Sequence, residues 1–460
     1  MNSLFSQFSA IYSFLGHPRL GREEILSFQN KQLLRLVAHA YEQVPYYRRL
    51  FDLNGIKPKD IQSVEDLPII PITTRKVLQS LPVEEIVAHN LKPESLIVSR
   101  TSGSSGEPIS IRSTWLEGRV LGVLRLRATL DFGLRITDRM TSVNLVRPTH
   151  PRNYQISSRI LQTLGLFRKT RIHCLLPPEE ILYELGQFRP DVLTGFPGVL
   201  SRLAEFVGDK DRLVIRPRFV RTGGEVLTPL MRRQIVEAFG APVFDTYGSY
   251  EFNLLAWECK ETGEYHTSDD GMIFEVIKDG RHATEGERGE VVGTNLHYFA
   301  MPLIRYKLGD IVTKGSESCR CGQPFSTIRA IQGRMIDYFS LPGGRMVHPY
   351  EIVAILRHDA ASWTRQYQLI QEREDRIIFR VVPSFTPESH RVASLEQSVT
   401  ALLGEGVEFR VMFVPEIQLE SSGKFRVFRS FVNSNYDGID WNRQQNTSHD
   451  LKIRDSEELP

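Results

Sequence analysis

Several features that would place the chain in a special class are missing from its sequence. Only four cysteines occur in 460 residues, which excludes a small disulfide-stapled scaffold and indicates a reducing compartment, so we expect a cytoplasmic protein. No apolar run approaches the roughly 20 residues of a transmembrane helix. The 57 basic and 55 acidic residues give a formal net charge of +2, which argues against a nucleic-acid partner.

The length and composition fit a soluble globular protein with more than one domain. Hydrophobic residues make up 41% and charged residues 24% of the chain, and 460 residues exceed one simple core. The segment Met1–Gly16 has no basic start or clean apolar core, so we expect a short amphipathic helix rather than a secretory signal. A polar tail over 436–460 is expected to be mobile.

Between about residues 95 and 250, short apolar strands alternate with helical patterns. Such alternation predicts an α/β fold with a largely parallel sheet covered by helices. Helical spacing is clear over Gly198–Val207 and Pro229–Phe239. The predicted strands are Leu96–Val98, Ser142–Val146, Arg171–Leu176, Asp191–Thr194, Arg218–Arg221 and Val243–Asp245.

The rest of the chain has a different texture. An N-terminal helix should stop at Pro45, since proline cannot continue a helix. The stretch 264–316 is β-rich, and strands and helices then mix in a compact α+β unit of about 100 residues. We therefore predict a large N-terminal domain over 1–332, with a β-rich segment at about 255–325, and a small mobile α+β domain over 333–435.

The stretch Arg100–Pro108 is rich in hydroxyl side chains and glycine. It follows an apolar strand, and its hydroxyl and N–H groups would form a concave donor surface that suits a polyphosphate. No Gly-Lys-Ser/Thr closes it, so it is not a Walker loop. A plain turn is the simpler interpretation. The predicted phosphate-binding residues are Thr101, Ser102, Gly103, Ser104, Ser105 and Gly106.

Four further motifs follow at strand ends and turns. Ligands of open α/β sheets bind at the carboxyl ends of strands, where Thr246-Tyr247-Gly248-Ser249-Tyr250-Glu251 is expected. Asp310 is predicted to terminate a strand, where its carboxylate could accept two ribose hydroxyls. Gln332-Gly333-Arg334 lies at the domain boundary, and Ser421-Ser422-Gly423-Lys424 forms a turn. Taken singly, these motifs also fit ordinary turns and solvated loops.

In this order, the motifs resemble those of the adenylate-forming acyl/aryl ligase superfamily. The chain is most similar to the phenylacetate–CoA ligase and CapK branch, and the resemblance covers nearly its whole length. Ala40–Arg48, Val64–Pro68 and Pro71–Arg75 resemble the opening of that branch. Gly195-Phe196-Pro197 and Thr222-Gly223-Gly224-Glu225 match further landmarks.

The resemblance implies a function and assigns roles to residues. Such ligases use ATP to convert a carboxylic acid into an acyl-adenylate, release pyrophosphate, and pass the acyl group to CoA or another thiol. Lys424 would stabilise the adenylation transition state, Glu251 would bind magnesium, and Arg334 would lie near the ribose site. The implied nucleotide-binding residues, besides Thr101–Gly106, are Gly223, Gly224, Glu225, Asp245, Thr246, Tyr247, Gly248 and Asp310.

The chain departs from the family pattern in three places. Glu107-Pro108-Ile109 stands where many relatives carry Gly-x-Pro-Lys, and Ile336 replaces a charged hinge residue. The first change removes a cation that faces the phosphates in those relatives. The second affects the hinge and, through it, the thioester half-reaction. The stretch 144–176 carries five arginines instead of a glycine-rich segment, which are either solvated or face an anionic substrate or acceptor: Arg147, Arg152, Arg159, Arg168 and Arg171.

Three cysteines and a histidine suggest a metal site. Cys319 and Cys321 form a tight knuckle, and Cys259 and His266 lie upstream in the same β-rich segment. Three thiolates and one imidazole match a closed tetrahedral site, so we predict a structural zinc. Ordinary buried cysteines are the alternative. The fourth cysteine, Cys174, is predicted to lie inside a strand as a core residue.

The sequence leaves the acid and its acceptor open. The acceptor is CoA, a carrier-protein thiol, or an amine or hydroxyl, as in surface-polysaccharide assembly or secondary metabolism. Dimers are common among such ligases, so a homodimer is the corresponding expectation. A non-catalytic nucleotide-binding scaffold is the competing class, and the joint presence of Glu251, Asp310, Arg334 and Lys424 argues against it.

Overall fold

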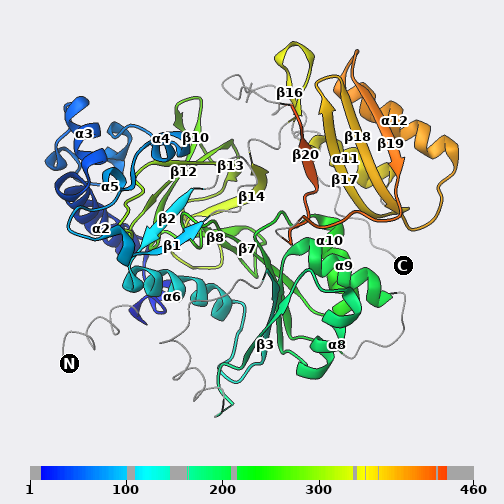
Figure 1. Ribbon diagram of the computed structural model, residues 1–460, viewed down its shortest axis with the longest axis horizontal. Coiled ribbons are helices and arrows are strands. Elements are labelled where there is room, and N and C mark those ends of the chain that lie inside the picture. Colours follow the sequence, from blue (N-terminus) through cyan, green and yellow to red (C-terminus); the bar gives the residue numbers. More distant parts are fainter. Residues whose placement is uncertain are drawn as a thin grey trace.

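A computed structural model describes most of the chain (Figure 1). It covers residues 12–100, 109–145, 163, 165–208, 215–334, 339–347, 349–360, 362–420 and 423–432. Several predictions therefore lie outside the described residues: the N-terminal helix up to residue 11, Thr101–Gly106 with the Glu107–Pro108 departure, Arg147, Arg152, Arg159, Ile336, Ser421, Ser422 and the tail 436–460.

Twelve strands form one large sheet. Those that come first in the sequence, β3 to β7, form its parallel half. The order is β11-β10-β12-β13-β14-β9-β8-β7-β6-β5-β3-β4. Every pairing among the strands from β7 to β4 is parallel, as the strand–helix alternation predicts. These strands are β3 (Met140–Asn144), β4 (Lys169–His173), β5 (Val192–Gly195), β6 (Phe219–Gly223) and β7 (Val243–Tyr247).

The second half of the sheet is antiparallel and contains the predicted β-rich segment. It continues from β7 without a break through the β7–β8 pair. Its strands are β8 (Ala256–Glu258), β9 (Tyr265–Thr267), β10 (Met272–Lys278), β11 (Arg281–His282), β12 (Arg288–Asn295), β13 (Tyr306–Lys314) and β14 (Thr327–Arg334). The parallel α/β part and the β-rich part thus share one sheet.

Helices cover both faces of the parallel half. On one face, α8 (Pro178–Phe188), α9 (Pro197–Gly208) and α10 (Pro229–Phe239) bury their apolar sides against alternate strand residues such as Val143 and Val220. On the other face, α6 (Trp115–Asp131) packs with Val192 and Phe219. α10 matches its prediction because Thr228 caps its start and Gly240 ends it with positive φ.

The N-terminal helices pack on the antiparallel half (Figure 1). α2 (Arg22–Gln43) ends before Pro45, as predicted, and Pro45 itself begins α3 (Pro45–Leu53), since proline is well suited to the first helical turn. The shorter elements of this region are η1 (His17–Arg19), η2 (Pro58–Asp60), η3 (Val64–Ile69), α4 (Arg75–Ser80), α5 (Val83–Ile86) and η4 (Pro93–Ser95). Among the described helices, none has the length and apolar character to cross a membrane.

The C-terminal unit has its own core and sheet. Its four-stranded sheet has the order β19-β18-β17-β20, and both α11 and α12 contribute to its apolar cluster. Figure 1 shows the unit beside α9 and α10. Its elements are β15 (Phe339–Ser340), η6 (Pro342–Gly344), β16 (Met346–Val347), α11 (Pro349–Asp359), β17 (Thr364–Arg373), β18 (Arg376–Pro383), α12 (Ser389–Leu403), β19 (Glu408–Phe413) and β20 (Phe428–Ser430).

Three local predictions were wrong. The apolar run Leu96–Val98 belongs to β1 (Ile97–Arg100), which pairs only with β2 (Ser110–Ser113) in a separate hairpin. Asp310 does not end a strand; it lies within β13, next to a bulge in the β13–β14 pairing. Cys174 lies just after β4 rather than inside it, although it is buried as predicted.

Candidate active site

The carboxyl ends of β6 and β7 approach each other closely at two glycines. A Cβ atom at Gly223 would lie 2.5 Å from Thr246 Oγ1, so only glycine fits there. Gly224 has a φ of +83° and faces the Phe196 ring, which a Cβ atom would meet at 3.0 Å. The structure thus brings together the Thr222–Glu225, Thr246–Glu251 and Gly195–Pro197 motifs that the sequence separates.

Tyr247 and Asp310 lie side by side in this region. The Tyr247 hydroxyl donates a hydrogen bond of 2.5 Å to Asp310 Oδ2, and both side chains are buried. Asp310 is the register partner of Arg334, whose backbone ends β14. Three predicted ribose- and adenine-site residues therefore come from adjacent points on β7, β13 and β14.

Glu251 is nearly fully buried and is paired with a residue that sequence reasoning did not assign to the site. Arg75 Nη2 lies 2.9 Å from Glu251 Oε1, and Arg75 Nε lies 3.4 Å from the Tyr306 hydroxyl. Thr74 caps α4, which begins at Arg75. Arg75 is the last residue of the Pro71–Arg75 motif that resembles the family. Its pairing with Glu251 could not be read from the sequence, because the two residues are 176 positions apart.

The Glu251 carboxylate suits a magnesium ion bound mainly through phosphates. Mg²⁺ is usually held by one or two carboxylates and substrate phosphates, and Glu251 supplies one carboxylate beside the strand ends. Its pairing with Arg75 shows that this buried group is placed against a cation in this structure.

Asp245 is engaged inside the protein. Its carboxylate accepts hydrogen bonds from Thr222 Oγ1 at 2.6 Å and from the Tyr265 hydroxyl at 3.0 Å. Burial raises the pKa of Asp245 to about 6, against the effect of the Thr222 hydrogen bond. These contacts tie β7 to β6 and β9, so Asp245 supports the strand end on which Thr246 and Tyr247 lie.

Lys424 reaches the same region from the C-terminal unit. Its Nζ lies 5.7 Å from the centre of the Phe196 ring. Gly423, with a φ of +73°, has its Cα so close to the Cys174 thiol that a Cβ atom would meet Sγ at 2.2 Å. The Gly-Lys turn predicted from sequence is therefore packed against the large sheet.

Glu225 joins the two parts of the molecule. Its Oε1 accepts a hydrogen bond of 2.6 Å from the Phe425 N–H, and its Oε2 accepts one of 2.9 Å from the Gly198 N–H. Burial raises the pKa of Glu225 to about 7, while these two hydrogen bonds and Lys424 oppose the rise. We predicted Glu225 as an adenine-site residue; in the structure its carboxylate holds the Lys424 loop.

Other contacts between the units are both polar and apolar. Gln234 Nε2 donates to the Arg365 carbonyl at 2.7 Å, and Arg202 and Glu416 form an exposed ion pair. Met231 of α10 joins the apolar cluster of the C-terminal unit. Polar and apolar contacts thus hold the C-terminal unit against α9 and α10.

The predicted zinc ligands come together. The ligand atoms of Cys259, His266, Cys319 and Cys321 all lie within 4.8 Å of one another. Cys259 Sγ and Cys319 Sγ are 3.8 Å apart, and His266 Nε2 is 3.3 Å from Cys321 Sγ. Tetrahedral zinc with Zn–S bonds of about 2.3 Å places its sulfur ligands about 3.8 Å apart, so the spacing fits a four-coordinate zinc. Burial lowers the pKa of His266 to about 4, which keeps the imidazole neutral as a ligand must be.

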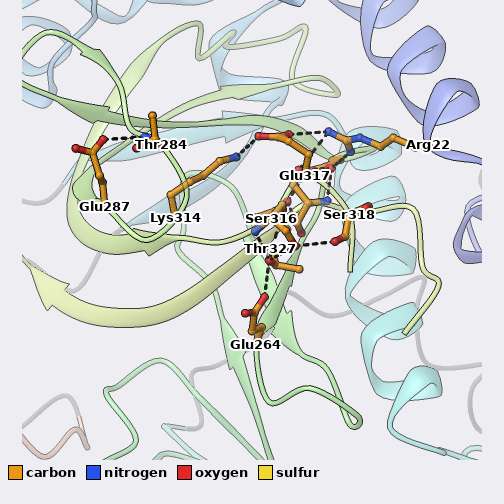
Figure 2. A network of polar contacts seen from close by, with 12 residues as sticks. Arg22, Glu264, Thr284, Glu287, Lys314, Ser316, Glu317, Ser318 and Thr327 are labelled. Atoms are coloured by element: carbon orange, nitrogen blue, oxygen red, sulfur yellow. Dashed lines mark hydrogen bonds and ion pairs between the residues drawn. The ribbon is translucent and has the colours of Figure 1, made fainter. Parts of the chain in front are cut away.

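A polar network fixes the chain that enters the cysteine knuckle (Figure 2). Thr327 Oγ1 donates to Glu264 Oε2 at 2.7 Å and accepts from the Ser316 N–H at 2.9 Å. Glu317 lies between Lys314, at 2.9 Å, and Arg22, at 3.4 Å. The network links α2, β13, β14 and Glu264, the residue before β9, around residues 316–318, just before Cys319.

Comparisons with known proteins agree with this geometry. The family model "CapK C-terminal domain" matches residues 341–430. Phenylacetate-coenzyme A ligase of Thermus thermophilus is 26% identical over 452 residues, covering 88% of this chain and 96% of that protein. Protein CapK of Staphylococcus aureus is 27% identical over 246 residues, 53% of each chain.

Solved structures show the same fold. A 2-hydroxyisobutyryl-CoA ligase in the postadenylation state, in complex with R3-HIB-AMP, superposes with a TM-score of 0.73 at 21% identity over 93% of each chain. The same ligase in the thioesterification state, with 2-HIB-AMP and CoA, gives 0.60 at 20% identity over 94% of each chain.

The fold is that of the adenylate-forming acyl ligases. Within that superfamily the chain is similar to phenylacetate–CoA ligases and to CapK.

Proposed function

We propose that the protein activates a carboxylic acid with ATP and transfers the acyl group to CoA. One carboxylate oxygen attacks the α-phosphorus, the bond to the bridging oxygen breaks, and pyrophosphate leaves with its electron pair. The thiol sulfur then attacks the acyl carbon, and AMP departs. The observation that carries the proposal is the Lys424 loop, held by Glu225 against the strand ends that carry Tyr247 and Glu251.

Each role follows from position and charge. Lys424, a point charge at the tip of the loop, would neutralise negative charge that develops at the α-phosphate. Asp310 would accept the ribose hydroxyls, with Tyr247 fixing its carboxylate and Arg334 nearby. Gly223, Gly224, Thr246 and Gly248 would form the adenine side, and the Thr101–Gly106 loop the phosphate side. Glu251 would hold the magnesium ion, whose charge would offset that of the phosphates.

The second half-reaction requires the C-terminal unit to move. We assign residues 1–332 to the large domain and 333–435 to the mobile one. The higher TM-score against the postadenylation state than against the thioesterification state supports a domain arrangement suited to adenylation. Rotation would withdraw Lys424 and admit the thiol.

The cysteine and histidine cluster is proposed to hold structural zinc. With three thiolates and one imidazole it leaves no open position, so the ion would link β8 and β9 to the knuckle and take no part in the reaction. The homodimer stays a prediction, which the molar mass from analytical ultracentrifugation would test.

ATP–pyrophosphate exchange across aryl, fatty, amino and sugar acids tests the proposal. Exchange with one acid class should fall by about 100- to 1000-fold in Lys424→Ala, as when one transition-state donor is removed. Unchanged melting temperature would show that the variant folds. Undiminished exchange in Lys424→Ala would contradict the assigned role.

CoA consumption then identifies the acceptor. Acid- and ATP-dependent loss of free CoA thiol would confirm the proposal. Exchange without CoA consumption would favour the second candidate, a ligase that joins the acid to an amine or hydroxyl, which the likeness to CapK brings into consideration. ATP binding without exchange would favour the non-catalytic scaffold.

A further inference from the structure

Two arginines lie in one row across the parallel half of the sheet. Arg171 of β4, Ser142 of β3, Thr194 of β5 and Arg221 of β6 are successive register partners. Side chains in register on neighbouring strands point to the same face. The row therefore presents two guanidinium groups with two hydroxyls between them.

The row faces α6, which adds a third arginine. Arg221 Nη1 donates a hydrogen bond of 2.5 Å to Thr129 Oγ1 of α6. Arg125 precedes Thr129 by four residues, so the two lie on the same side of the helix. Lys169, two residues before Arg171 in β4, lies on the same face of the sheet. We call Arg125, Lys169, Arg171 and Arg221 the basic patch.

The charges of the basic patch are not balanced. Among the described residues, none of its four members forms an ion pair with an acidic side chain. At the opposite ends of the same strands, Arg139 is paired with Asp191 and Arg218 with Asp138. Burial and the nearby Arg125 lower the pKa of Arg221 to about 9, and burial followed by Arg221 and Arg171 lowers that of Lys169. Arg221 is half-buried and the other three side chains are exposed, so the like charges of the basic patch share one open face.

The basic patch borders the candidate active site. Arg221 precedes Gly223 by two residues on β6. Arg125 interacts electrostatically with Tyr250, the neighbour of Glu251. An acid whose carboxylate is activated at the ends of β6 and β7 would therefore extend its remaining part toward these side chains.

We propose that the basic patch binds a second carboxylate of the substrate, so that the acids activated are dicarboxylic. The inference rests on the proposed function and names its substrate class. Guanidinium groups match carboxylates as planar forks with two parallel hydrogen bonds. A monocarboxylic acid would gain none of these contacts, so the dicarboxylic acid is preferred.

Matched acid pairs test the substrate class. We would measure ATP–pyrophosphate exchange with hexanoate against adipate, and with phenylacetate against 4-carboxyphenylacetate. The wild-type protein should prefer the dicarboxylate of each pair. Arg221→Gln should lower kcat/KM for dicarboxylates by about 10- to 100-fold, the effect of losing a hydrogen bond between charged groups, and leave monocarboxylates unchanged. Arg168→Gln, which changes an exposed arginine just before β4 and outside the basic patch, is the matched control.

Other results would overturn the inference. Equal use of both members of each pair, or an equal loss for both in Arg221→Gln, shows that the basic patch does not read the second carboxylate. If no acid supports exchange, the proposed function loses its support. Thermal unfolding then tests, independently of activity, whether the basic patch binds a dicarboxylate. Adipate should raise the melting temperature of the wild-type protein but not of Arg221→Gln; no shift in the wild type contradicts the patch. Without ligand, Arg221→Gln should melt at the same temperature or higher.

Discussion

Arginines face both halves of the twelve-stranded sheet, but their burial and their partners differ. On the antiparallel side, the buried Arg127 of α6 forms a two-pronged contact with Asp270, and the buried Arg305 is held by Glu275 and by the carbonyls of Pro68 and Ile70. On the parallel side, the exposed Arg125 of α6 and the half-buried Arg221 of β6 have no acidic ion-pair partner among the described residues. Matched charge stabilises the architecture, whereas unmatched charge at strand ends is available to a ligand.

Breaking the matched side should have the largest effect on stability. Asp270→Asn would leave Arg127 buried without a counter-charge, beside the Trp257 and Phe325 rings. We expect a loss of about 3 to 5 kcal/mol in the free energy of unfolding, measured with urea. Asp52→Asn, which removes an exposed pair with Lys57, should give no measurable change and serves as the control.

The same carboxylate predicts a dependence on acid. Burial would raise the pKa of Asp270, but Arg127 and His17 outweigh it and lower the pKa to about 2. A lowered folded-state pKa stabilises the fold above the ordinary aspartate value near 3.8, and this contribution is lost as the pH falls toward 2. Asp270→Asn should lack this part of the acid dependence; an identical acid profile in both proteins would contradict it.

Removing a cluster ligand should have the next largest effect. Protein purified without added metal is expected to contain about one zinc per chain, and Cys319→Ser should lose it and melt at a lower temperature. Cys174→Ser, which changes the cysteine outside the cluster, should keep its zinc. Less than about 0.2 zinc per chain in the unaltered protein would contradict the site.

Glu225 extends the comparison to the boundary between the large domain and the C-terminal unit, where its carboxylate bonds both sides. In Glu225→Gln, an amide N–H would face one of the two backbone N–H groups. Adenylation should slow by about 10-fold, while thioester formation from supplied acyl-adenylate should not slow. Equal slowing of both half-reactions would indicate a general structural defect.

The pH adds a second readout for Glu225. Its pKa of about 7 with the loop docked exceeds the ordinary value of 4.5, which water would restore on undocking. Docking is therefore strengthened by protonation as the pH falls from 7 toward 4.5, and is weakest above 7. Lys424 and Glu420 also face Glu225, so their charges affect the same pH range. We would therefore measure the ratio of the adenylation rate to the thioester-formation rate against pH in both proteins. The wild-type protein should show an inflection in this ratio that Glu225→Gln lacks.

Local signals in the sequence were enough for much of the fold. α10 was predicted to the residue because its cap, its proline and its final glycine are all local. The family motifs indicated most residues that meet at the strand ends. The Cys/His cluster was also predictable, because thiolate and imidazole pairs are rare and chemically specific.

Contacts between distant segments were not predictable. Asp310 looked like a strand end because an acid followed a glycine, but β13 continues through it by a bulge. Arg75 gave no sign of its pairing with Glu251, and Glu225 gave none of its bond to a backbone group 200 positions away. The register that assembles the basic patch likewise appears only once the strands are ordered.

The two hydrogen bonds of Glu225 have a consequence for exchanging parts between enzymes. Both donors are main-chain N–H groups, at Gly198 and Phe425, and every residue except proline supplies one. Attachment by the main chain is insensitive to most side-chain divergence in the loop. A C-terminal unit grafted from a relative should therefore still dock, provided that position 198 stays glycine, since a Cβ atom there would meet Phe425 at 2.1 Å.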